Sequence, residues 1–142
     1  MINKKEISSF QKNGYLIKKT SDLKSLNNLQ DFIYKILSKD KKNVPKDKIK
    51  YFETLHSFIK KKELNDFRVS AITKVNKNKK FRDYYYNSAK EMLDGLVGNE
   101  IAMQKKINLS IQIPKDNKSM LPMHSDIYAG ESPFEVVVWI PL

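Results

Sequence analysis

The sequence predicts an α+β fold in which helices come first and strands follow. Apolar residues recur at helical spacing through most of residues 22–97. In the last third of the chain the hydrophobic period falls to two, and residues 134–140 form an apolar, β-branched run. Separate runs of helices and strands are typical of α+β domains. We therefore expect residues 1–142 to form one domain, mainly helical over 1–100 and stranded over 101–142.

One short strand and four helices are expected in the first part of the chain. A turn at residues 13–14 precedes residues 15–17, which are predicted to form a buried strand. Asp22 supplies an N-cap for the first helix, and Gly98 is well placed to stop the last one. The helices are expected over residues 22–38, 45–62, 65–75 and 81–97.

The second part of the chain is expected to form strands over residues 101–103, 106–113, 120–126 and 134–140. Residues 106–113 alternate most regularly, with isoleucine and leucine on one side and Asn108, Ser110 and Gln112 on the other. Such a polar side suits the interior of a barrel that encloses a polar ligand. It equally suits the solvent-facing side of an ordinary sheet.

Composition restricts the classes of function. The net charge of +11 invites a nucleic-acid partner, but arginine occurs only at Arg68 and Arg82, and recognition of phosphates and bases favours arginine. We interpret the lysines mainly as a solvated surface, which makes nucleic acid a disfavoured partner. The absence of cysteine excludes disulfides and thiolate metal sites. No signal peptide or membrane span is visible, so a cytoplasmic protein without a membrane partner is the default expectation.

An imidazole and a carboxylate lie two positions apart at His124 and Asp126. On a strand, these two side chains would project from the same face. Together they are two of the three ligands of the 2-His-1-carboxylate triad, which holds non-haem Fe(II) and leaves positions open. A single His-x-Asp sequence also fits a surface histidine or one that only makes a hydrogen bond.

Three stretches resemble the phytanoyl-CoA dioxygenase-type oxygenases, which depend on Fe(II) and 2-oxoglutarate. They are residues 108–114 (Asn-Leu-Ser-Ile-Gln-Ile-Pro), 121–126 (Leu-Pro-Met-His-Ser-Asp) and 130–142 (Gly-Glu-Ser-Pro-Phe-Glu-Val-Val-Val-Trp-Ile-Pro-Leu). More narrowly, the pattern is similar to a bacterial subgroup found among surface-carbohydrate biosynthesis genes. Residues 10–17 also resemble the usual opening of this superfamily, more loosely.

The resemblance implies a double-stranded β-helix, a jelly-roll or cupin-like barrel of eight strands with flanking helices, of which this chain would hold a truncated part. It implies that His124 and Asp126 are iron ligands. It places Gln112 or Asn108 where relatives hydrogen-bond the 2-oxoglutarate co-substrate. The resemblance further implies that Ser110 and Trp139 line the substrate pocket. Trp139 could instead be a tryptophan of the hydrophobic core.

The chain departs from the family pattern after Asp126, because no histidine, arginine or lysine follows it. The distal histidine and the basic residue that clamps 2-oxoglutarate are therefore not in this chain, and His56 is expected on a helix. A half-barrel would also leave the edge at residues 136–139 open to a second copy or a complementing chain. In this chain, iron would be bound only by His124 and Asp126.

We therefore expect an Fe(II)- and 2-oxoglutarate-dependent dioxygenase that hydroxylates a polar small molecule, such as a sugar or nucleotide sugar. This chain would carry only the His-x-Asp half of the site and would show little or no turnover by itself. It would be a truncated oxygenase or one half of a split enzyme. The alternative is a basic, non-enzymatic module that binds nucleic acid or an acidic partner.

Overall fold

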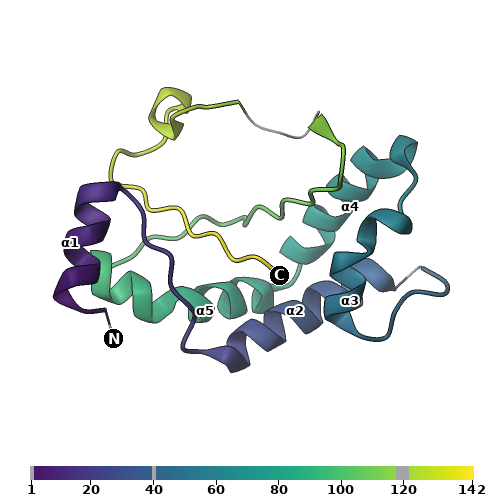
Figure 1. Ribbon diagram of the computed structural model, residues 1–142, viewed down its shortest axis with the longest axis horizontal. Helices are drawn as coiled ribbons and strands as arrows, with labels where there is room; N and C mark the ends of the chain where they lie inside the picture. Colours follow the sequence, from purple (N-terminus) through teal and green to yellow (C-terminus); the bar gives the residue numbers. More distant parts are fainter. Residues whose placement is uncertain (1, 40, 118–121) are drawn as a thin grey trace.

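The computed structural model of the chain describes residues 2–39, 41–117 and 122–142, and among these residues it contains helices and extended segments but no strand (Figure 1). The predicted α+β fold with a partial β-helix barrel is therefore wrong for the described part of the chain. The predicted strand over residues 120–126 lies partly outside the described residues. The helices are α1 (Lys4–Asn13), α2 (Leu23–Ser38), α3 (Lys48–Glu53), α4 (Leu64–Asn76) and α5 (Lys79–Val97), with 3-10 turns η1 (Leu55–Ser57), η2 (Lys61–Glu63) and η4 (Asp126–Ala129).

The longest helices agree with the prediction because their apolar spacing and their caps point the same way. α2 begins after Asp22, whose side chain accepts a hydrogen bond from the Ser25 amide at 2.8 Å. α5 begins two residues before the predicted start because Asn78 accepts from the Lys80 amide at 3.0 Å. It ends at Gly98, which adopts a φ of 86°.

The predicted helix over residues 45–62 is interrupted after α3. The Thr54 hydroxyl donates to the Lys50 carbonyl at 2.6 Å, and the Thr54 backbone adopts φ −105° and ψ 9°, outside the helical region. Two short 3-10 turns, η1 and η2, continue the chain from there. The apolar spacing suggests one helix, but the residues form three short elements, α3, η1 and η2, beside the same core.

The chain opens with a helix that the sequence prediction missed. Asn3 and Glu6 form a capping box, in which the Asn3 side chain accepts from the Glu6 amide and Glu6 accepts from the Asn3 amide. The predicted buried strand at residues 15–17 is wrong, because these residues form no strand and the side chains of Tyr15 and Ile17 are 63% and 89% exposed. The hydrophobic side chains that follow α1 therefore do not open a sheet.

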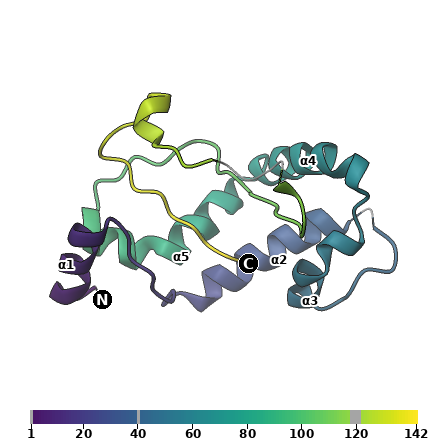
Figure 2. The ribbon, with the colours of Figure 1, turned by 45° about the horizontal axis from the view of Figure 1, so that its top comes forward.

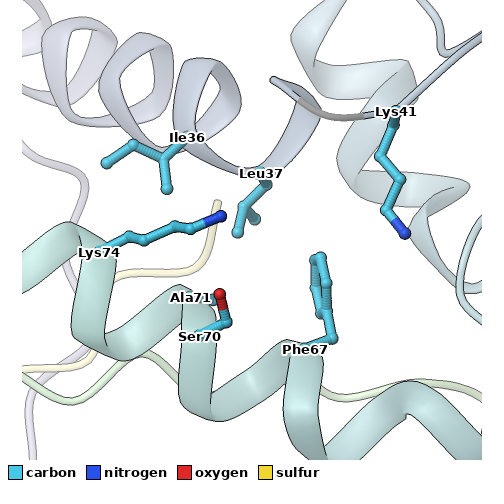
Figure 3. A pocket seen from close by; sticks show the side chains of 7 residues that line it. All are labelled: Ile36, Leu37, Lys41, Phe67, Ser70, Ala71 and Lys74. Carbon is cyan, nitrogen blue, oxygen red and sulfur yellow. The ribbon is translucent and has the colours of Figure 1, made fainter.

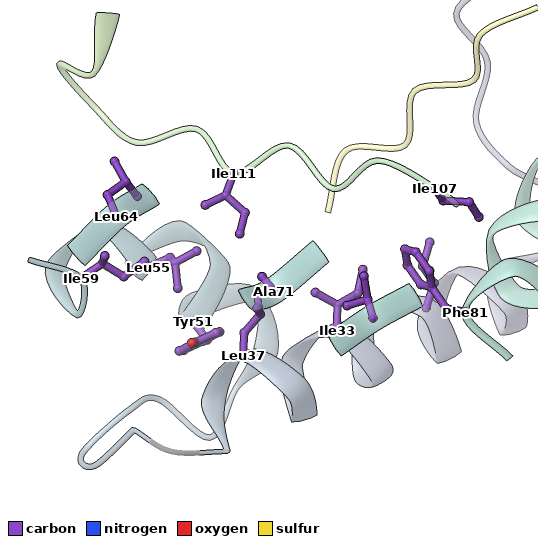
Figure 4. Packing of buried hydrophobic residues seen from close by; sticks show 12 residues of the cluster. Ile33, Leu37, Tyr51, Leu55, Ile59, Leu64, Ala71, Phe81, Ile107 and Ile111 are labelled. Atoms are coloured by element: carbon purple, nitrogen blue, oxygen red, sulfur yellow. The ribbon is translucent and has the colours of Figure 1, made fainter. Parts of the chain in front are cut away.

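The core lies between a layer of helices and the extended segments that cross it. α2 runs along α5 and also contacts α3 and α4 (Figures 1 and 2). Leu29, Ile33 and Leu37 lie one turn apart on α2 and are each at most 6% exposed, so they form the central stripe of the core. The remaining buried members are shown with them in Figure 4 and are Tyr51, Leu55, Ile59, Leu64, Ala71, Val75, Phe81, Ile107 and Ile111.

Helix side chains hold the first extended segment, residues 101–113, in place of a neighbouring strand. The Asn76 side chain accepts from the Ile107 amide at 2.8 Å and donates to the Ile107 carbonyl at 2.9 Å. Arg68 donates to the Ile111 carbonyl from two nitrogens and to the Asp116 carboxylate at 2.8 Å. Backbone groups that a sheet would pair are thereby satisfied from α4. This is why a period-two segment is present without a sheet.

The second extended segment, residues 134–142, is fixed in a similar way. The Tyr85 hydroxyl on α5 donates to the Val138 carbonyl at 2.6 Å. Val136, Val138, Ile140 and Leu142 are partly buried, whereas the residues between them are exposed. The segment therefore alternates as the sequence predicts, but it lies on helices.

Tyr51 on α3 is fully buried, yet its hydroxyl has no hydrogen-bond partner in the described structure. Burial, with the neighbouring Tyr34, raises the pKa of Tyr51 to about 12. We expect Tyr51→Phe to raise the free energy of unfolding by about 1–3 kcal/mol, because it removes an unsatisfied polar group and keeps the ring. Urea denaturation measures this change.

The matched control for Tyr51→Phe is Tyr34→Phe. The Tyr34 hydroxyl donates to the Pro45 carbonyl at 2.8 Å, so its removal is expected to destabilise the fold. The pH dependence gives a second check. Because burial raises the folded-state pKa of Tyr51 above the unfolded value of ~10, the folded state holds the phenol proton more tightly, and stability is expected to fall as the pH rises from ~10 through about 12. Equal effects of the two variants would contradict the assignment.

Candidate functional site

His124 and Asp126 lie in the segment that leads into η4, which stands away from the helical layer in both ribbon views (Figures 1 and 2). Asp126 is the first residue of η4, so the prediction that a strand carries the pair is wrong. The turn nevertheless brings the two side chains together, with His124 Nε2 3.2 Å from Asp126 Oδ1. Both side chains are about half exposed.

The backbone determines which nitrogen of His124 carries a proton. His124 Nδ1 lies 2.8 Å from the carbonyl oxygen of Pro122. A carbonyl oxygen only accepts hydrogen bonds, so Nδ1 must be the donor. In a neutral ring, Nε2 then carries a lone pair, and this lone pair faces an anionic carboxylate oxygen. Two electron-pair donors at this distance require a cation between them, either a second ring proton or a metal ion.

The pair fits a metal ion in donor type and in spacing. Nitrogen and oxygen ligands of a first-row metal lie at about 2.1 Å, so two ligands at right angles are about 3 Å apart. The 3.2 Å between Nε2 and Oδ1 is close to that value. Imidazole and carboxylate are also the donors that hold non-haem Fe(II). The hydrogen bond from Nδ1 to a backbone carbonyl is the orientation that metal-ligating histidines usually have.

The prediction of a metal-binding group is not supported as a complete site of three protein ligands. The residues that the structure describes contain no group of three His, Cys, Asp or Glu side chains able to hold a metal ion. His56, the other histidine, is exposed in η1. Within the described part of the chain, His124 and Asp126 can therefore supply two ligands and no third.

The surroundings of the pair are negatively charged. The pKa of the Glu135 carboxyl is raised above its ordinary value by loss of hydration, by the neighbouring Glu131 and, more weakly, by Asp126. Residues 122–142 contain no lysine or arginine that would offset these carboxylates. The carboxylates of Glu131 and Glu135 therefore add negative charge near Asp126, which favours a cation there.

The candidate co-substrate and pocket residues of the first extended segment face solvent. Asn108, Ser110 and Gln112 are exposed, and the Gln112 amide donates to the Ser110 hydroxyl at 2.8 Å. Their polar side lines no barrel interior in the described part of the chain, because it faces solvent and no strand pairs with this segment. Ile107 and Ile111 on the opposite side are buried against the helices. The prediction of an enclosing barrel is therefore wrong for the described residues. The predicted roles of Asn108 and Gln112 in co-substrate binding and of Ser110 in the substrate pocket remain predictions.

Trp139 is 77% exposed on the second extended segment, so its alternative as a core tryptophan is wrong. Phe134 and Val137 on the same segment are also exposed, at 91% and 52%. The structure pairs His124 with Asp126 and Gln112 with Ser110, on two different segments. It leaves the predicted pocket role of Trp139 untested.

Two hollows on the helical part were not predicted from the sequence, because each joins residues far apart in the chain. The first, of about 200 Å³, lies between α2 and α4 (Figure 3). Its floor is apolar, and Lys41 Nζ lies 5.5 Å from the centre of the Phe67 ring. The second, of about 290 Å³, lies beside the last turn of α4. Neither is lined by His124 or Asp126.

Comparison with known proteins adds no relative: no family model, curated protein or solved structure matches the chain. A search of the described helices for a membrane span found none that combines sufficient length with sufficient apolar character.

Proposed function

We propose that His124 and Asp126 are two ligands of an Fe(II) site and that the chain contributes them to a 2-oxoglutarate-dependent oxygenase. The observation that carries the proposal is the contact of His124 Nε2 with Asp126 Oδ1, with Nδ1 committed to the Pro122 carbonyl. This arrangement supports the proposal because it directs two electron pairs toward one position, where a cation would stabilise both. The oxygenase class, and a sugar-like substrate, rest on the resemblance of residues 108–142 alone.

The residues of this chain would hold and orient the metal. Nε2 and Oδ1 would bind it, and the Pro122 carbonyl would keep the ring in the tautomer whose Nε2 is free to bind. When bound, iron with 2-oxoglutarate supplies the activation of O2 for hydroxylation of a C–H bond. The third protein ligand and the anchor for 2-oxoglutarate would come from outside the described residues.

Metal binding is expected at His124 and not at His56. Substoichiometric Mn²⁺ should broaden the ring proton resonances of His124 in an NMR titration and leave those of His56 sharp. His56 serves as an internal control because it is exposed and makes no ion pair with a carboxylate of the described residues. Asp126→Asn should abolish the selectivity, since an amide is a weaker ligand than a carboxylate. Equal broadening of both histidines would show ordinary surface binding and would contradict the proposal.

Turnover by this chain alone is expected to be little or none, because two ligands hold Fe(II) poorly. The measurement is succinate release with Fe(II) and 2-oxoglutarate. Robust release that His124→Ala abolishes would contradict the view that this chain carries only part of the site. Release that His124→Ala leaves unchanged would contradict the assignment of His124.

A further inference from the structure

A hollow of about 290 Å³ lies between the last turn of α4 and the bend at residues 105–106. Its volume is roughly ten times the ~30 Å³ that a water molecule occupies in the liquid. It is open to solvent and holds enough space for a chain of two or three phosphate groups. Its lining consists of Ile72, Thr73, Asn76, Lys77, Lys105 and Lys106.

The two sides of this hollow are fixed to each other. Asn76, on its α4 side, holds the Ile107 backbone by the paired hydrogen bonds described above and donates also to the Ile72 carbonyl at 2.9 Å. Ile107 itself is 7% exposed and belongs to the core. Lys105 and Lys106 immediately precede this anchor, so the bend that carries them cannot move far from Lys77. The backbone on the two sides of the hollow is therefore held together, and the exposed lysine side chains extend from it.

The charges around the hollow have one sign. Three lysine residues line it, and no aspartate or glutamate does. Lys18, Lys48 and Lys90 each form an ion pair elsewhere on the surface. By contrast, none of the three lysines at the hollow makes an ion pair with a residue that the structure describes. Placing like charges around one hollow costs electrostatic energy that a bound anion would offset.

We propose that this hollow binds the phosphate groups of a polyphosphate-bearing ligand. Lysine binds phosphate as a compact point charge, and the exposed Thr73 hydroxyl can donate a further hydrogen bond. The absence of arginine from the lining argues for recognition of charge rather than of base edges. The same phosphate chemistry is offered by a free polyphosphate and by the backbone of a single-stranded nucleic acid. The proposal does not depend on the iron site.

Two probes, sodium tripolyphosphate and a single-stranded oligonucleotide, test the proposal by isothermal titration calorimetry at low ionic strength. The pocket variant is Lys77→Ala with Lys105→Ala and Lys106→Ala. The matched control is Lys60→Ala with Lys61→Ala and Lys62→Ala, which removes the same charge from exposed positions around η2. The pocket variant is expected to bind about tenfold more weakly or worse, and the control to stay within about threefold of the original chain.

Selective loss of tripolyphosphate binding identifies a free polyphosphate as the ligand, and selective loss of oligonucleotide binding alone identifies a nucleic-acid backbone. Equal losses in both triple variants would show that only net charge matters and would overturn the proposal, as would the failure of both probes to bind. Thr73→Val provides a variant without a charge change, and it should weaken binding of the same probe. Circular dichroism verifies that each variant is folded.

Discussion

Ile33→Ala is expected to lower the free energy of unfolding by about 2–5 kcal/mol. Ile33 is 2% exposed at the centre of the α2 stripe, so its removal leaves a cavity between α2 and the elements packed on it. Small domains are stable by only about 5–15 kcal/mol in total. The change would therefore remove a large part of the stability, and chemical denaturation monitored by circular dichroism measures it.

Ile17→Ala is the matched control for Ile33→Ala, because it deletes the same atoms from a side chain that is 89% exposed. It should change the stability by no more than about 0.5 kcal/mol. If the two variants lost similar amounts of stability, the helical layer would not be the core of this protein. A large loss for Ile17→Ala alone would indicate that residues 15–17 are buried, as the strand prediction required.

Arg68→Ala is expected to cost about 3–5 kcal/mol. The Arg68 guanidinium joins α4 to the first extended segment through the Ile111 carbonyl and the Asp116 carboxylate. The Asp116 side chain is only 6% exposed, so its charge loses a guanidinium partner in a poorly solvated place. Denaturant unfolding gives the loss, and faster hydrogen exchange in residues 107–113 should accompany it.

Two comparisons control the Arg68 prediction. Lys48→Ala breaks the more exposed ion pair with Asp31, whose side chain is 52% exposed, and should cost no more than about 1 kcal/mol. Arg68→Ala combined with Asp116→Asn should cost less than the sum of the single variants, because the carboxylate is then gone as well. Additive single effects would show that the two side chains do not act as a pair.

Local sequence signals predict the helices with the strongest periodicity. α2 and α5 combine a long apolar stripe with a cap residue next to it, so short-range information suffices for both. The capping box of Asn3 and Glu6 is also a local signal, and attention to it would have predicted α1.

The absence of a sheet from the described residues could not be predicted in this way. Period two along residues 107–113 says correctly that one side is buried, but it does not say what the backbone binds. Asn76 lies 31 positions before Ile107, and Arg68 lies 43 positions before Ile111. Only the tertiary structure shows that these side chains take the place of neighbouring strands.

The two candidate sites also differ in how far the sequence predicts them. His124 and Asp126 are close in sequence, and their contact in space follows from their spacing. The Pro122 carbonyl, which decides the tautomer, follows only from the turn that the chain makes there. The lysine-lined hollow brings together Lys77 and Lys105, which no motif in the sequence connects.

We propose that His124 Nε2 and Asp126 Oδ1 share a metal ion. Nitrogen NMR of the imidazole rings, with and without the diamagnetic Zn²⁺ as probe, tests this proposal. We expect Zn²⁺ to shift His124 Nε2, to leave its Nδ1 protonated toward Pro122, and to leave both nitrogens of His56 unchanged. A His124 ring that keeps a proton on Nε2 toward Asp126, unaffected by Zn²⁺, would show that the two residues make only a hydrogen bond and would contradict the account.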